Sequence, residues 1–170
     1  MHEDAKQTPT GPPSVPEQLV EGIRRAIEQP LEHENARITV VVEGGVRGEH
    51  YEFTYTVDAT GAAFGVMRDE LRGRAMEHRA DPDPNRFGEL ARAIDLDALV
   101  GVHRPAIGYP PDSVIGTLEV TDGRQTVRVP FLAGDSEQRA RAKEPDAVTR
   151  AADAAFAHAE RTLGTEDLRP

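Results

Sequence analysis

The chain has 170 residues, 38% of them hydrophobic, which suits one ordinary domain with some exposed or disordered polypeptide. It contains no cysteine, which excludes disulfide bonds, thiolate zinc sites, iron–sulfur clusters and cysteine nucleophiles. With 30 acidic and 20 basic residues, the net charge of -10 repels a phosphate backbone, so we expect no binding to nucleic acid.

The N-terminal segment is polar. Residues 1–14 are rich in proline and threonine, the composition of a disordered arm. They lack the apolar core of a signal peptide, and no run in the sequence approaches the roughly 20 apolar residues of a membrane span. We therefore expect a cytoplasmic protein that does not associate with membranes.

A helix is predicted over residues 15–30, ahead of the main domain. Ser14 and Glu17 fit a capping box, and apolar residues then recur at helical spacing until Pro30. The apolar stripe is narrow, so the helix is expected to dock on the edge of the domain or on a second chain.

Two strands joined by a glycine-rich segment are predicted next. From Arg37 the apolar residues alternate with polar ones, and a second alternating run extends from Tyr51 to Val57. Glycine supplies the positive φ angles that hairpin turns require. A strand follows these glycines, so the segment lacks the helix N-terminus of a phosphate-binding loop. The predicted hairpin tip consists of Gly44, Gly45, Val46, Arg47 and Gly48.

Residues 62–80 leave two alternatives open. Apolar residues at helical spacing favour a helix, although Gly65 and Gly73 weaken it. Alternation over residues 62–68 favours a third strand followed by a charged loop. We favour the strand.

The remaining elements are predicted from turn and periodicity signals. The prolines within residues 81–85 exclude helical structure there, so the next helix begins after them and extends to about Leu99. Residues 101–113 are predicted to form an irregular loop. A second hairpin over residues 114–131 turns at Asp122-Gly123. A final amphipathic helix occupies residues 145–163.

Together these elements predict an α+β domain over residues 36–164, with a tail at 165–170. Its antiparallel sheet consists of two hairpins, four or five strands in all, with helices packed on one face. The disordered arm and the N-terminal helix precede this domain.

No cofactor or metal site is predicted. The six histidines include no pair at i, i+4 on a helix, the spacing that binds zinc in many enzymes. Asp81, Asp83 and Asn85 resemble the start of a calcium loop, but Arg86 and Arg92 stand where that loop requires glycine and glutamate.

One enzymatic alternative uses His103 with Asp112 or Ser113. The sequence lacks the G-x-S-x-G elbow that presents a nucleophilic serine, and Asp-Ser after two prolines is ordinary turn chemistry. We therefore expect a protein without enzymatic activity.

The order of elements is similar to that of the emfourin family, small bacterial inhibitors of protealysin-type M4 metallopeptidases. Gly44-Gly45, Pro111-Asp112 and Asp122-Gly123 stand at the corresponding points, over about residues 36–163. Val46 and Val114 depart from the aromatic residues expected after the first two motifs.

The resemblance implies a small binding protein whose partner is a metallopeptidase. Its contact residues would be the hairpin tip, Gly44 to Gly48, with His50, together with His103 and Tyr109 from the loop at 103–113. The alternative is an accessory protein that assembles with itself or with a larger complex through the N-terminal helix.

Overall fold

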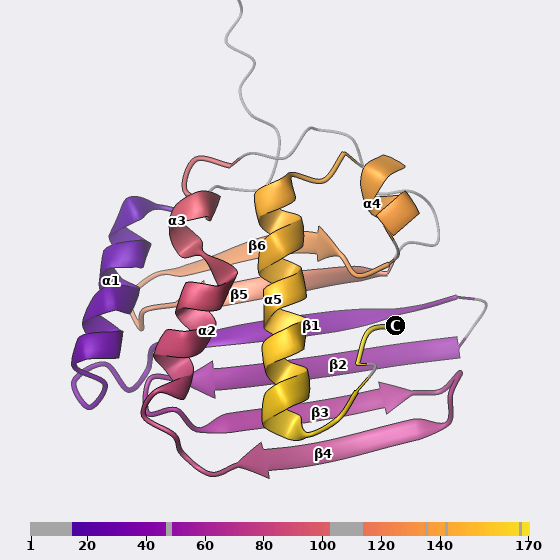
Figure 1. The fold of residues 1–170 in the computed structure, drawn as a ribbon, viewed down its shortest axis with the longest axis horizontal. Helices are drawn as coiled ribbons and strands as arrows, with labels where there is room; N and C mark the ends of the chain where they lie inside the picture. Colours follow the sequence, from indigo (N-terminus) through magenta and orange to yellow (C-terminus); the bar gives the residue numbers. More distant parts are fainter. Residues whose placement is uncertain (1–14, 47–48, 103–113, 135, 142, 167) are drawn as a thin grey trace, which may run out of the picture.

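A six-stranded antiparallel sheet in the order β4-β3-β2-β1-β5-β6 is the framework of the protein (Figure 1). The computed structural model describes residues 15–46, 49–102, 114–134, 136–141, 143–166 and 168–170. The strands are β1 (Arg37–Val46), β2 (Glu49–Asp58), β3 (Ala63–Asp69), β4 (Arg74–Ala80), β5 (Ile115–Thr121) and β6 (Thr126–Leu132).

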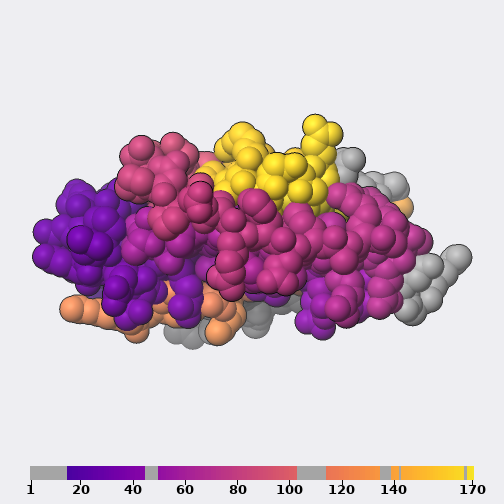
Figure 2. Space-filling model, turned by 90° about the horizontal axis from the view of Figure 1, so that it is seen from below, coloured from indigo at the N-terminus to yellow at the C-terminus, as the bar shows by residue number. Residues whose placement is uncertain are grey.

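The helices are α1 (Glu17–Glu28), α2 (Arg86–Ile94), α3 (Leu96–Leu99), α4 (Ser136–Arg141) and α5 (Asp146–Leu163). Of these, α1, α2, α3 and α5 lie on one face of the sheet, and α5 crosses its strands (Figure 1). Figure 2 views the molecule from the β4 edge, with α5 (yellow) in the upper layer. None of the described helices covers the opposite face of β1–β4, which we call the open face.

The core lies between the sheet and α5. Phe53 on β2 stacks on Phe156 of α5 with ring centroids 5.6 Å apart, and Phe131 of β6 meets the same ring edge-on at 6.1 Å. Gly65 lets the end of α5 approach β3, because a Cβ atom there would lie 2.4 Å from Leu163 Cδ1. These contacts fix α5 across the middle of the sheet.

The α+β class and the helices on one face were predicted correctly, but the sheet has more strands than the four or five expected. The strand favoured over residues 62–68 is confirmed as β3, and it pairs with β4 in a third hairpin, so the helical alternative is wrong. The predicted charged loop after residue 68 is therefore wrong, because Arg74–Ala80 pairs with β3 along its whole length. This edge strand is mostly exposed, and its sequence shows little apolar alternation.

The helix predicted up to Leu99 is interrupted. Asp95 adopts a left-handed conformation with φ of 54°, which ends α2 and starts the short α3.

Asp58 caps the turn before β3 by accepting a hydrogen bond from the Thr60 amide at 2.9 Å. Gly61 has φ of +84° at this turn, and a Cβ atom there would lie 1.7 Å from the Asp83 carbonyl oxygen.

Helix α1 belongs to the same hydrophobic core as the sheet. Leu19 and Ile23 are fully enclosed and α1 contacts both α2 and α3. Gly22 lies against the β5–β6 turn, where a Cβ atom would lie 2.2 Å from Asp122 Oδ2. The apolar stripe of α1 is thus buried within its own chain. The helix begins at Glu17 with Pro16 at the N-cap position, so the predicted capping box with Ser14 as the cap is wrong. Ser14 itself lies outside the described residues.

The segment after α5 returns to the sheet. The side chain of Leu168 is fully buried, and the Tyr51 hydroxyl donates a hydrogen bond to its carbonyl oxygen. Arg74 of β4 donates another to the Glu166 carbonyl at 3.1 Å. No helix within the described ranges combines the length and apolar character needed to cross a membrane.

Candidate binding surface

Two hairpins end at the same end of the sheet. Tyr51, near the start of β2, pairs with Asp69 at the end of β3, so the end of β1, the start of β2 and the β3–β4 connection lie at one end of the sheet (right side of Figure 1). Leu71, in the β3–β4 connection, is 69% exposed. We call this end of the molecule the hairpin end.

The register corrects the predicted role of the first glycines. Gly44 pairs with Tyr51 and Gly45 pairs with His50, so both glycines extend β1 instead of forming the turn. A Cβ atom at Gly44 would lie 3.2 Å from the Val114 side chain, so the glycine leaves room for the entry to β5. Val46 closes the ladder by pairing with Glu49.

Four of the eight predicted contact residues are placed by the structure. Gly44, Gly45, Val46 and His50 all lie on the β1–β2 ladder at the hairpin end. The other four, Arg47, Gly48, His103 and Tyr109, lie outside the described residues, as do Asp112 and Ser113 of the enzymatic alternative.

A row without charges crosses the open face over β3, β2 and β1 and continues onto β5. Val66 on β3 pairs with Thr54 on β2, which pairs with Val41 on β1, which pairs with Thr117 on β5. Paired residues share one face of an antiparallel sheet, so these side chains form a continuous strip. Val66 is 36% exposed at one end of the strip. Sequence reasoning missed this strip because it depends on the order of the strands.

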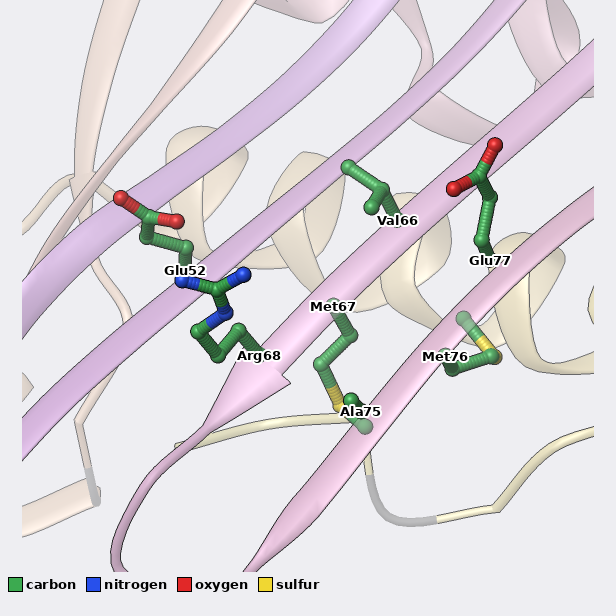
Figure 3. Close-up of a pocket in the computed structure, with 7 residues that line it drawn as sticks. All are labelled: Glu52, Val66, Met67, Arg68, Ala75, Met76 and Glu77. Carbon is green, nitrogen blue, oxygen red and sulfur yellow. The ribbon is translucent and has the colours of Figure 1, made fainter.

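A hollow of about 360 Å³ adjoins Val66 on β2, β3 and β4 (Figure 3). It combines apolar side chains with one cation and two carboxylates. Arg68 extends from β3 toward Glu52 on β2 (Figure 3), and its positive charge contributes to lowering the pKa of Glu52. The lining residues are Glu52, Val66, Met67, Arg68, Ala75, Met76 and Glu77.

A carboxylate–histidine cluster lies beside the hollow. His50 Nε2 is 2.7 Å from Glu52 Oε1. This hydrogen bond raises the pKa of His50, and the charges of Glu52, Glu70 and Glu43 raise it further against the opposing effect of partial burial. The same bond is the main cause of the lowered pKa of Glu52. Glu70 also accepts a hydrogen bond from the His50 backbone amide at 3.0 Å.

Glu43 completes the cluster from the neighbouring strand. It pairs directly with Glu52, and one ligand atom from each of Glu43, His50 and Glu52 lies within 4.8 Å of the other two. Neither the i, i+4 spacing of a helical zinc site nor the pattern of a calcium loop includes these three residues, because the register of a hairpin brings them together. A Glu-x6-His-x-Glu spacing across a predicted hairpin is the signal that could have found them.

A second polar pair lies inside the core. Tyr55 on β2 and His158 on α5 are 0% and 3% exposed, and the Tyr55 hydroxyl lies 2.9 Å from His158 Nδ1. Burial, followed by the charges of Arg161 and Arg86, lowers the pKa of His158 to about 4, so the imidazole is neutral near pH 7. Burial also raises the pKa of Tyr55 to about 12. The pair is enclosed on both sides, so it serves the core rather than a surface site.

A scan against models of known protein families finds no match for this chain. A search of curated protein sequences finds none either.

Proposed function

We propose that this protein is a non-enzymatic binding protein whose protein partner docks on the open face at the hairpin end. The observation that carries the proposal is the continuity of three features. The uncharged strip through Val66, the hollow over β2–β4 and the cluster around His50 adjoin one another. An apolar patch rimmed by polar groups is typical of protein interfaces.

The charges around the hollow define the partner's chemistry. Glu52 and Glu77 line the hollow together with Arg68, and the charges of Glu43 and Glu70 act on the neighbouring His50. Carboxylates therefore predominate here, as they do in the whole chain. Opposite charges across an interface accelerate and orient association. A complementary partner presents an apolar side chain to the hollow and basic groups around it.

The resemblance to emfourins supplies the class of partner, a protealysin-type M4 metallopeptidase. Inhibition of a protease requires a rigid surface that occupies its cleft and needs no catalytic group of the inhibitor. The paired β1–β2 and β3–β4 hairpins offer such a rigid surface, because each is tied to the rest of the sheet.

The test combines a binding assay with peptide hydrolysis by a protealysin-type M4 metallopeptidase. The wild-type chain is expected to bind and inhibit at micromolar concentration or below. Val66→Glu should weaken both effects about tenfold or more, because it places a carboxylate in the uncharged strip, close to other carboxylates.

Leu31→Glu is the matched control. Leu31 is 84% exposed and lies between α1 and β1, away from the hairpin end, so its replacement should leave binding unchanged. Absence of inhibition at micromolar concentration would exclude the metallopeptidase. Equal loss in the two variants would exclude the open face as the docking surface.

The alternative is an accessory protein that assembles through α1. Helix α1 buries its apolar stripe against α2 and α3, which leaves charged residues such as Glu21 and Arg24 on its exposed side. Assembly through α1 would therefore rely on ion pairs. A fall in the mass of the wild-type protein in solution on raising the salt concentration would support this alternative.

A further inference from the structure

The cluster of Glu43, His50 and Glu52 has the composition of a metal site. Zinc and other divalent first-row metal ions bind imidazole nitrogen and carboxylate oxygen. Three protein ligands with an open fourth position are the usual arrangement where the ion also contacts a further molecule. The strands supply these ligands from a regular ladder, so their positions along the sheet are fixed.

The geometry allows all three side chains to reach one ion. Their ligand atoms already lie within 4.8 Å of one another. Tetrahedral ligands at about 2.0–2.2 Å from zinc are roughly 3.4 Å apart, so the most distant ligand atoms must approach each other by little more than an ångström. His50 Nε2 and Glu52 Oε1, which are 2.7 Å apart, must separate slightly to admit the ion. Side chains that are 38% exposed at His50 and 51% exposed at Glu52 can make this movement by rotation.

The cluster also has an electrostatic reason to take up a cation. Glu43 and Glu52 stand directly opposite each other, and like charges in that position destabilise a sheet. Glu70 adds a third carboxylate beside His50 through its contact with the backbone amide. In the described part of the chain, His50 is the one basic group paired with Glu52 within 4.0 Å, and the charge of Arg68 acts on Glu52 from farther away.

We propose that Glu43, His50 and Glu52 form a binding site for a divalent first-row metal ion of the zinc type. The imidazole and one oxygen from each carboxylate bind the ion, and its remaining position faces solvent at the hairpin end. A proton competes with the ion for His50, so binding weakens as the pH falls. The site does not depend on the proposed partner, because all three ligands belong to this chain.

The test is a titration of the full chain, free of affinity tags, with zinc chloride in isothermal titration calorimetry. We expect one equivalent of zinc to bind and to shift the imidazole resonances of His50 in the NMR spectrum. His50→Gln and Glu43→Gln should each weaken binding about tenfold or more, because each removes one of three ligands. Both replacements lie on the open face and preserve the core.

His78→Gln is the control, because His78 is an exposed histidine on β4 outside the cluster. This variant should bind zinc as the wild-type chain does. Equal affinity of the wild-type chain and His50→Gln would overturn the proposal. Magnesium binding as tight as zinc binding would also overturn it, because magnesium prefers oxygen ligands and would indicate a carboxylate cluster only.

Discussion

Strand β2 presents two different faces to its surroundings. Toward the helices it contributes aromatic and aliphatic side chains that are 5% exposed or less, and toward the open face it contributes polar ones. The first set is Tyr51, Phe53, Tyr55 and Val57, and the second is His50, Glu52, Thr54 and Thr56. Because strand side chains alternate, residues one position apart are under different constraints. A single strand thus stabilises the fold with one face and offers binding groups with the other.

The largest expected effect comes from the helix-facing side of β2. Phe53→Ala removes a fully buried ring that stacks on Phe156, and should lower the free energy of unfolding by about 3–5 kcal/mol. Thr54→Ala, one residue further along the same strand, should lower the free energy of unfolding by less than about 1 kcal/mol, because Thr54 lies on the open face. Urea denaturation measures both variants. Similar costs at the two positions would show that the open face is covered in solution.

The second largest expected effect is a dependence of the free energy of unfolding on pH, caused by the buried His158. The unfolded chain protonates this residue near its ordinary pKa of 6.5, whereas the folded chain keeps it neutral down to about pH 4. The neutral imidazole therefore contributes fully to stability above pH 6.5. As the pH falls from 6.5 to 4, this contribution is lost, and the free energy of unfolding decreases by about 3 kcal/mol in total.

Urea denaturation at several pH values between 7 and 4 measures this loss. The groups that act on His158 are Tyr55 from β2, Arg86 from α2 and Arg161 from α5. His158→Gln removes the titrating group, so the variant should lose less stability than the wild-type chain between pH 6.5 and 4. Equal losses would contradict the assignment of a neutral, enclosed imidazole.

The smallest effect comes from the open face. Glu43→Gln removes one of two carboxylates that oppose each other, and in metal-free buffer should raise the free energy of unfolding by a few tenths of a kcal/mol. The gain should disappear at high salt, where exposed charges are screened. Glu77→Gln is the control, because Glu77 pairs with the uncharged Val66. A stabilisation of the same size in the control would indicate a general effect of net charge.

The parts of the fold that the sequence predicted are those with strong local signals. The alternation in β1 and β2, the Asp122-Gly123 turn and the stripe of α5 each correspond to an observed element. Asp122 Oδ1 accepts hydrogen bonds from the amides of Arg124 and Gln125, both at 2.8 Å, which is how an Asp-Gly turn is held. Strand β4 was missed because an edge strand needs few buried side chains, and Met76 is its main one.

The candidate surface was harder to predict because it depends on pairings between strands. The sequence placed His50 next to a hairpin, but it could not show that Glu43 stands opposite Glu52. A shift of one residue in the register would have moved Glu43 to the other face of the sheet. Two glycines assigned to the turn belong to the ladder, and this lengthens the hairpin enough to include His50.

The two edges of the sheet have a consequence for behaviour at high concentration. An open edge can pair with the edge of another molecule and start aggregation, and proteins prevent this with charges and proline on edge strands. Strand β4 carries Arg74, Glu77 and Arg79, and β6 contains Pro130, which has no amide hydrogen to donate. Both edge strands thus disfavour the pairing of one molecule with another that would start a fibril. We therefore expect association through the sheet edges to stay weak when the protein is concentrated.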